Sequence, residues 1–411
     1  MRILFLNPVG VLGGAERALV DLLACLRTLE PSASLHLLAG TDGPLLEEAR
    51  ALGVDCRLLA LPERLSALGD SGLRGQGAGA ALSLARQLAP VPGLLAGYLR
   101  QLRREVRAVR PQVLHSNGIK THLLSPATVG LPVARVWHIH DFLGERPLVR
   151  RALRALSPLA AVAIANSRAV GVDAQEVLGS VSVKVVYNGV DVERFCPGSG
   201  EGSRLDGLSG LAAAPEGTLR LGLVATYARW KGHEVFLQAA ARLVRARPGL
   251  PVRFYLVGAP LYRTPDSQFS EQELRGLVER LGLSGHVGLV PFQREPSAVY
   301  RALDIFVHAS TRREPFGLTI AEALACGRPA VISRASGAAE QLMEGVDALT
   351  LPPGDLEALA AALLRLVEDA GLRERLGQAA RKTALLRFAR ERYAREILDI
   401  YRALPGAGGA P

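Results

Sequence analysis

Cysteine is rare in this chain of 411 residues, and the four cysteines are far apart: Cys25, Cys56, Cys196 and Cys326. They show neither C-x-x-C nor Cys/His ligand spacing, so the sequence indicates no disulfide framework and no zinc site. A D-x-D sequence, which could hold a divalent cation, is also missing. We therefore expect no bound metal, no cofactor, and free thiols in a reducing cytoplasm.

Long apolar runs are missing as well. No stretch approaches the roughly 18 consecutive apolar residues that a membrane-spanning helix needs. The apolar residues 3–6 follow Arg2, but Asn7 and Pro8 interrupt them and Gly-Gly-Ala-Glu follows in place of a cleavage site. This pattern favours a first strand entering a glycine turn over a signal peptide. We expect a cytoplasmic protein, with peripheral binding at the inner face of the plasma membrane as an open alternative.

Acidic residues are few where basic ones gather. The formal net charge is +10, and between Arg64 and Arg110 eight arginines stand against Asp70 and Glu105. Aromatic residues that could stack on bases are not interleaved with these arginines, so nucleic acid is not expected as a partner. Apolar residues 81–84 and 94–99 lie within the same region. The region fits an amphipathic surface that binds anionic lipid, and equally a solvated helix face.

Nearly half of the residues are apolar and 21% are charged, a globular composition in a chain too long for one ordinary core. Short apolar runs alternate with longer Ala/Leu-rich periodic segments, which predicts α/β units with parallel sheets. Strands are expected at 3–7, 35–38, 113–115, 133–138, 161–165 and 184–187, and then at 219–225, 254–257, 286–289, 305–307, 330–332 and 348–350. Helices are expected at 15–29, 234–247, 271–281, 319–326 and 356–368, and through 372–404.

The segment 197–217 is rich in Gly, Ser, Ala and Pro without a sustained period, and is interpreted as a linker. The prediction is an N-terminal Rossmann-like domain over 1–196 and a C-terminal one over 218–385. A helix at 386–404 is expected to cross back to the N-terminal domain. Two doubly wound domains of this kind would face each other across a cleft, with ligands at the carboxyl ends of the strands.

The most informative local pattern is residues 313–329, REPFGLTIAEALACGRP, directly after an expected strand. Glu314 and Glu322 flank a glycine turn that opens into a helix, where backbone N–H groups and the helix dipole favour an anion. The residues whose N–H groups are expected to face that anion are Phe316, Gly317, Leu318 and Thr319. Two carboxylates beside such a turn suit a sugar diphosphate. Taken alone, the pair also fits an ordinary strand–loop–helix unit.

The whole string resembles glycosyltransferase family 4, the retaining family with the GT-B fold, whose motif E-P-F-G-x-x-x-x-E-A-x-A-x-G-x-P it matches without a gap from Glu314 onward. Further family-like stretches occur in the expected order: GGAE at 13–16, HIHD at 138–141, NS at 166–167, YNGVD at 187–191 and WKGH at 230–233. The resemblance implies that Glu314 holds the donor sugar, Glu322 binds the ribose, and Lys231 neutralises the diphosphate. A fixed cation there would stabilise the departing nucleoside diphosphate without a metal.

One position departs from the family pattern. Members carry Gly-Arg shortly before the lysine, and here Ala225-Thr226 fills that place. Arg229, two residues before Lys231, is the candidate replacement for the phosphate-binding arginine.

The remaining candidates come from loops in both halves. Gly13 and Gly14 form a turn in which backbone approaches phosphate or sugar closely. The resemblance places His140 near the reacting centre, on the donor sugar. His115 and Asn117, at another strand end, are expected on the acceptor side. The nucleobase is expected at Gly258, Pro291 and Phe292.

The resemblance implies transfer of a sugar from a nucleoside-diphosphate sugar to a hydroxyl, with retention of configuration. The basic N-terminal region suggests a lipid-linked or cell-surface glycan as the acceptor, met at an anionic membrane. Two alternatives stay open: an epimerase or phosphorylase on the same fold, and a catalytically silent scaffold that docks at membranes.

Overall fold

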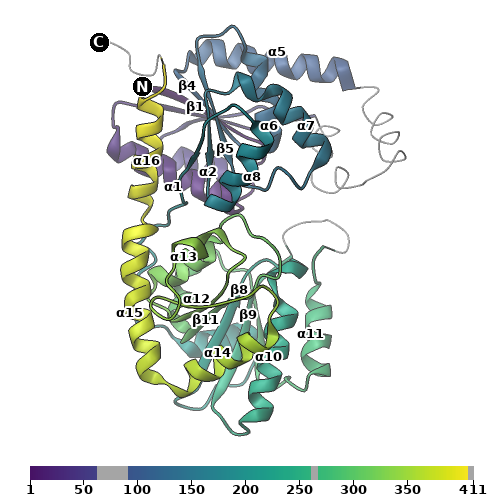
Figure 1. Ribbon diagram of the computed structural model, residues 1–411, viewed down its shortest axis with the longest axis vertical. Helices are drawn as coiled ribbons and strands as arrows, with labels where there is room; N and C mark the ends of the chain where they lie inside the picture. The colour runs from purple at the N-terminus through teal and green to yellow at the C-terminus, as the bar shows by residue number, and fades with distance from the viewer. Residues whose placement is uncertain (63–90, 261–266, 406–411) are drawn as a thin grey trace. The chain divides into compact units, whose positions relative to one another are not determined.

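The computed structural model describes residues 1–62, 91–260 and 267–405. The chain divides into two compact units (Figure 1). Unit 1 comprises Met1–Gly189 together with Arg390–Pro411, and unit 2 is the continuous stretch Val190–Ala389. Each unit is built around one parallel sheet.

The seven-stranded sheet of unit 1 has the order β3-β2-β1-β4-β5-β6-β7. Its strands are β1 (Arg2–Asn7), β2 (Ser34–Ala39), β3 (Asp55–Leu58), β4 (Val113–Asn117), β5 (Ala134–Ile139), β6 (Val162–Ala165) and β7 (Val183–Val185). Its helices are α1 (Gly14–Leu29), α2 (Pro44–Ala51), α5 (Val91–Val109), α6 (Ile119–Leu124), α7 (Pro147–Leu156), α8 (Arg168–Leu178) and α16 (Arg390–Arg402). The order is that of a doubly wound sheet.

Both faces of this sheet are buried, as a parallel sheet requires. Along β1, Ile3 and Phe5 pack into a core that includes residues of α1, α2 and α16. Leu4 and Leu6 point the other way, into a core with α5. The alternation follows from the two-residue period of a strand, so helices must cover the sheet on both sides.

The six-stranded sheet of unit 2 has the order β10-β9-β8-β11-β12-β13. Its strands are β8 (Leu219–Val224), β9 (Val252–Gly258), β10 (Val287–Pro291), β11 (Ile305–His308), β12 (Ala330–Ser333) and β13 (Leu349–Leu351). Its helices are α9 (Gly202–Ser209), α10 (His233–Ala246), α11 (Glu271–Arg280), α12 (Ser297–Ala302), α13 (Leu318–Ala325), α14 (Leu356–Glu368) and α15 (Ala370–Arg387). Counted from β8, this is the Rossmann order 3-2-1-4-5-6, which confirms the predicted fold class of two doubly wound α/β domains.

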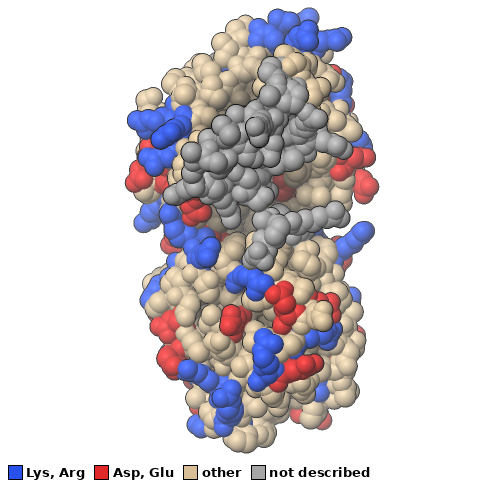
Figure 2. Space-filling view, turned by 90° about the vertical axis from the view of Figure 1, so that its right-hand side faces the viewer, with Lys and Arg blue, Asp and Glu red and all other residues tan. Residues whose placement is uncertain are grey.

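The basic region predicted at 64–110 lies partly outside the described residues. Within them, α5 carries Arg100, Arg104 and Arg107 on its exposed surface, and Arg110 follows it. Figure 2 shows Lys and Arg side chains gathered at the upper end of unit 1, the end at which α5 lies in Figure 1. No helix among the described residues is long and apolar enough to cross a membrane.

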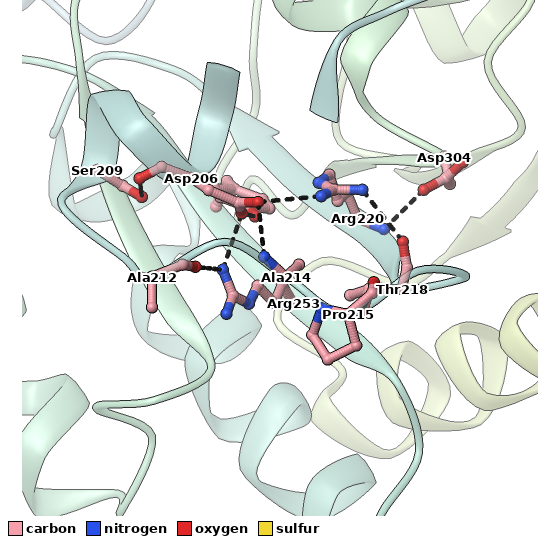
Figure 3. Close-up of polar contacts among 10 residues, drawn as sticks. Asp206, Ser209, Ala212, Ala214, Pro215, Thr218, Arg220, Arg253 and Asp304 are labelled. Atoms are coloured by element: carbon pink, nitrogen blue, oxygen red, sulfur yellow. Dashed lines mark hydrogen bonds and ion pairs between the residues drawn. The ribbon is translucent and has the colours of Figure 1, made fainter. Parts of the chain in front are cut away.

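The segment interpreted as a linker, 197–217, is part of unit 2 instead. It contains α9, whose Asp206 is buried and accepts hydrogen bonds from Arg220 (3.0 Å), Arg253 (2.9 Å) and the N–H of Ala214 (3.1 Å) (Figure 3). The hydroxyl of Tyr255 also donates to Asp206. The linker prediction is wrong because these ion pairs, which reach β8 and β9, fix a segment whose composition is that of a loop.

The C-terminal helical segment predicted over 372–404 is two helices. α15 ends at Arg387, and α16 begins at Arg390 and packs on α1 within unit 1. Between them, the Phe388 carbonyl accepts a hydrogen bond from the N–H of Val190 (2.7 Å). The two places where the chain passes between the units are therefore hydrogen-bonded to each other. The sequence also missed β3, a short strand with mostly exposed residues.

Candidate functional site

The central pair of the candidate site lies in loops that follow two neighbouring strands of unit 2. Lys231 ends the short 3-10 turn Arg229–Lys231 after β8, and Glu314 follows β11. β8 and β11 pair directly in the sheet, so their loops meet at the carboxyl edge. The Lys231 ammonium forms an ion pair with Oε1 of Glu314. The structure therefore brings together two residues that are 83 positions apart and were predicted as site residues.

Two further side chains hold Glu314, and the sequence pointed to neither. His308 Nε2 donates to Oε2 of Glu314 (2.7 Å), and Ser310 Oγ donates to the same oxygen (2.7 Å). Burial alone would favour the protonated acid. The Lys231 ammonium and His308 outweigh it and lower the pKa of Glu314 well below its usual range. The carboxylate is ionised and buried, and each of its two oxygens has at least one hydrogen-bond or ion-pair partner.

Backbone packing at a glycine positions the lysine. Gly232 has φ +81°, and a Cβ at this position would clash with the carbonyl oxygen of Ala309. The N–H of Thr311 donates to the Trp230 carbonyl (2.8 Å). The W-K-G sequence thus locks the loop after β8 against the end of β11. The Nζ atom of Lys231 lies 4.3 Å from the centroid of the Trp230 ring.

The glycine turn predicted before α13 is present. Gly317 caps the helix with φ +95°, and the Phe316 carbonyl accepts from the N–H of Ala338 (2.9 Å). Leu318 and Thr319, partly exposed, occupy the first turn, where helix N–H groups have no partner within the helix. This end of α13 carries the positive end of the helix dipole beside the Lys231–Glu314 loop region.

Glu322 is buried one turn further along α13. The hydroxyl of Tyr300, on α12, donates to its Oε2 (2.6 Å). Tyr300 was not predicted, and its 22-residue separation from Glu322 gives no periodic signal. Glu322 is therefore a buried, oriented acceptor rather than a surface charge.

The arginine suggested as a phosphate-binding group is held by other residues. Arg229 pairs with Glu273 (2.5 Å), and its guanidinium lies 4.3 Å from the centre of the Phe269 ring. Both side chains of the ion pair are more than a third exposed. The structure thus does not place Arg229 in the hydrogen-bonded group around Glu314.

The three residues expected at the nucleobase do come together. Pro291 at the end of β10 lies opposite Gly258 at the end of β9, and Phe292 follows with 57% of its surface exposed. A Cβ on Gly258 would clash with the Ala225 carbonyl oxygen. The result is a strand edge bordered by an exposed aromatic ring.

Unit 1 joins its predicted residues through one chain of hydrogen bonds. His140 Nε2 lies 2.7 Å from Asn117 Oδ1, and Asn117 Nδ2 donates to Asn7 Oδ1 (2.8 Å). Asn7 Nδ2 donates to Glu16 Oε1 (3.2 Å), and Glu16 Oε2 accepts from the N–H of Gly13 (3.1 Å). The ends of β1 and β4 and the residue after β5 are thereby linked to the glycine turn before α1, whose first residue is Gly14.

The orientations of the two asparagine amides in this chain of hydrogen bonds also determine which ring nitrogen of His140 carries hydrogen. Asn7 Nδ2 donates to the Val9 carbonyl (2.6 Å) as well as to Glu16, so Asn7 Oδ1 must be the acceptor for Asn117. Asn117 Oδ1 then faces His140, whose Nε2 must carry hydrogen. Burial lowers the pKa of His140 to about 4, so the ring is neutral near pH 7.

The structure differs from the acceptor-side role predicted for His115. The side chain is fully buried, and its Nδ1 lies 2.6 Å from the hydroxyl of Tyr401 on α16. Asn117 is also buried and serves as a link in the chain of hydrogen bonds. Among the described residues, no group of His, Cys, Asp and Glu is suited to hold a metal ion.

Comparison with known proteins identifies the family to which this chain belongs. A family model described as "Glycosyl transferases group 1" matches residues 212–383, and one described as "Glycosyltransferase Family 4" matches residues 12–194. The D-inositol 3-phosphate glycosyltransferase of Thermobifida fusca is 30% identical over 298 residues, which are 66% of this chain and 67% of that protein. The chain belongs to glycosyltransferase family 4, with the GT-B fold.

Individual relatives show over how much of its length this chain is similar to known proteins. The D-inositol 3-phosphate glycosyltransferase of Corynebacterium urealyticum is 32% identical over 249 residues, 59% of this chain. That match spans 57% of the relative's length. The match to the D-inositol 3-phosphate glycosyltransferase of Saccharomonospora viridis spans 50% of that protein. The crystal structure of Anabaena HepE in complex with UDP-glucose superposes with a TM-score of 0.78 at 25% identity, covering 98% of this chain and 100% of that one.

Proposed function

We propose that this protein transfers a sugar from a nucleoside-diphosphate sugar to a hydroxyl acceptor with retention of anomeric configuration. One observation carries the proposal. A lysine and a buried, ionised glutamate form a pair beside the N-terminus of α13, in loops at the carboxyl edge of the unit 2 sheet. This edge is where doubly wound sheets bind nucleotides. Relatives named as glycosyltransferases and the HepE complex with UDP-glucose support it.

Each group has a task that follows from its charge. The departing nucleoside diphosphate gains negative charge as the glycosidic bond breaks, and Lys231 and the first turn of α13 supply fixed positive charge. Glu314 accepts hydrogen bonds from hydroxyls of the donor sugar, and Glu322 from the ribose. The acceptor hydroxyl attacks from the face that the diphosphate leaves, and a phosphate oxygen takes its proton. No covalent nucleophile, metal or cofactor is required.

In unit 1, we propose that His140 binds the donor sugar and that the backbone of Gly13 and Gly14 approaches the donor closely. Gly258, Pro291 and Phe292 are proposed to border the base. HepE was crystallised in complex with UDP-glucose, which favours a uridine donor for this chain as well.

The acceptor is proposed to be a lipid-linked or cell-surface glycan met at an anionic membrane. The exposed arginines of α5 and those of α7, Arg150, Arg151 and Arg154, support a basic surface on unit 1. Such a surface attracts anionic headgroups over about a Debye length. The protein is therefore proposed to act at the inner face of the plasma membrane.

The proposal is tested by incubating the purified protein with a panel of UDP-, GDP- and ADP-sugars and measuring nucleotide release. Glu314→Gln keeps the shape but removes the charge, so we expect turnover to fall by roughly 100-fold or more while the fold and UDP binding persist. The control is Glu279→Gln, at an exposed position on α11, which should retain full turnover. Near-normal turnover in Glu314→Gln would exclude the role given to Glu314.

The alternatives predict other products. An epimerase converts the donor without an acceptor, and a phosphorylase yields a sugar phosphate. Product analysis of the same reactions separates both from transfer, and a silent scaffold would turn over none of the donors.

A further inference from the structure

The two carboxylate oxygens of Glu314 have different neighbours. Oε1 faces the ammonium of Lys231, whereas Oε2 accepts from His308 Nε2 and Ser310 Oγ, both at 2.7 Å. His308 and Glu314 are almost completely buried, with 5% and 7% of their side-chain surfaces exposed. One oxygen is thus bound by a charge at the end of a long side chain, and the other by two shorter side chains at the end of β11.

His308 donates from Nε2 in this arrangement. Its Nε2 must carry hydrogen because Glu314 Oε2 can only accept. Its Nδ1 is buried and has no hydrogen-bond partner among the described residues. The ammonium of Lys231 supplies a full positive charge to the other oxygen of Glu314.

Ser310 is anchored from its other side. Its carbonyl oxygen accepts a hydrogen bond from Ser333 Oγ, at the end of β12, at 2.6 Å. The hydroxyl that holds Oε2 is thereby fixed to the neighbouring strand. His308 itself is the last residue of β11. His308 consequently lies on a strand and Ser310 in the loop that follows it, tied to β12, whereas Lys231 lies on the 3-10 turn after β8.

In the proposed function, Lys231 binds the diphosphate of the donor and Glu314 binds its sugar. In this structure the two side chains bind each other instead. A diphosphate carries more negative charge than one carboxylate and competes for the ammonium. If Lys231 turns toward phosphate, Oε1 loses its partner inside a buried site, and an unpaired buried charge is unstable unless other donors hold it. His308 and Ser310 are the donors that remain.

Resting on the proposed function, we propose that donor binding separates Lys231 from Oε1 of Glu314, and that this oxygen then accepts a hydroxyl of the donor sugar. His308 and Ser310 are positioning residues that hold Oε2 throughout. The sugar hydroxyl takes the place of the ammonium, so Glu314 never lacks a donor. In the free protein the pair keeps both side chains in place for the donor.

The test compares His308→Leu, which removes the donor, with His308→Gln, whose amide places an N–H near the position of Nε2. Nucleotide release from the donor chosen by the panel is measured against pH, and UDP affinity by calorimetry. We expect His308→Leu to lower kcat about 10- to 100-fold, as for a misplaced reacting group. In the pH profile of nucleotide release by this variant, the acid limb should move to higher pH by about one unit or more, because Glu314 then protonates more easily.

Three comparisons make this result specific. His308→Gln should restore kcat to within about fivefold of wild type and return the acid limb. UDP lacks the sugar, so its affinity should stay within about twofold in His308→Leu and fall about 10-fold or more in Lys231→Met. Ser310→Ala should resemble a milder His308→Leu. Circular dichroism and melting temperature report whether each variant folds.

Wild-type kcat and acid limb in a folded His308→Leu would overturn the inference and leave the proposed function standing. A wild type that cleaves no donor would instead remove the proposed function, and this inference with it. A measurement on the unmodified chain adds an independent check. ¹⁵N spectra of histidine-labelled protein, with His308 assigned by its loss in His308→Gln, should show hydrogen on Nε2 of His308, before and after UDP-sugar is added. A ring protonated at Nδ1 alone would overturn it.

Discussion

At the scale of single residues, unit 1 buries a group of histidines under the C-terminal helix. The ring centroids of His115 and His138 are 5.2 Å apart, and those of His138 and His140 are 4.1 Å apart. Burial lowers the pKa of His115 to about 3 and that of His140 to about 4, and it lowers the pKa of His138 well below its usual value. The folded unit therefore holds these rings neutral at pH values where the unfolded chain would protonate them.

We expect unit 1 to lose stability as the pH falls below about 6.5. Between that value and the folded pKa of each ring, the unfolded state binds more protons, which costs about 1.4 kcal/mol of unfolding free energy per pH unit and histidine. Urea unfolding from pH 7.5 to 5, followed by circular dichroism, measures the slope. His138→Phe should flatten it and His286→Asn, at a partly exposed position in unit 2, should not. A midpoint for unit 1 that does not change with pH would contradict this.

The sequence predicted some residues of the site and missed others for a physical reason. Glu314, Glu322 and Lys231 stand in local motifs, and the structure places each at a buried or partly buried position. His308 and Ser310 were missed although they lie close to Glu314, because a histidine at the end of a strand has no spacing that marks its partner. His115 was misplaced because the helix that covers it lies 286 residues further on at Tyr401.

At the scale of elements, α9 and the residues after it show how a segment with loop composition becomes ordered. The helix has eight residues and little apolar surface, yet Leu205 and Asp206 are buried. Asp206 accepts from Arg220 and Arg253, and the N–H of Arg220 donates to Asp304 (2.7 Å) (Figure 3). These bonds join parts of unit 2 that no local pattern relates, so composition alone indicated a linker.

Replacing Asp206 by Ala should destabilise unit 2 by roughly 3–5 kcal/mol, because two arginines would keep their partly buried positions without a counter-charge. For a domain of this size we expect the melting temperature of unit 2 to fall by about 10 °C or more. Calorimetry measures it. Glu216→Ala, an exposed acidic position in the same segment, is the control and should change stability by no more than about 0.5 kcal/mol. Equal melting temperatures would show that the ion pairs contribute nothing net.

At the scale of the whole molecule, the charge is uneven as well as positive. The chain carries +10, and α5 exposes arginines at the upper end of unit 1 (Figure 2). A net charge influences association with charged surfaces rather than the fold. The alternation of strands and helices was enough to predict two doubly wound sheets. The sequence predicted a helix at 386–404 that returns to the first domain, and α16 (Arg390–Arg402) belongs to unit 1. The first passage was misplaced, because unit 2 begins at Val190, before the segment 197–217 that was interpreted as a linker.

We expect vesicles containing anionic lipid to bind the protein, and the binding to weaken as salt rises from about 50 to about 500 mM. Exchanging Arg100, Arg104 and Arg107 for Gln should reduce binding at least about 10-fold, since each basic residue near the surface contributes about 1 kcal/mol. The control exchanges Arg245, Arg280 and Arg375, exposed arginines of unit 2, and loses the same net charge. Cosedimentation measures both. Binding that ignores salt, or equal losses in the two triple variants, would exclude the α5 surface.

The position of α16 has a consequence for the order in which this protein is made. Tyr393, Ile397, Leu398 and Tyr401 complete the core of unit 1, yet the ribosome adds them only after the whole of unit 2. Unit 2 is continuous and can fold once Ala389 has emerged, whereas the first 189 residues must wait with apolar surface uncovered. Unit 1 is thus begun before unit 2 and completed after it. A chain released before α16 is made would contain a folded unit 2 and an incomplete unit 1, which chaperones and proteases recognise by its exposed apolar surface.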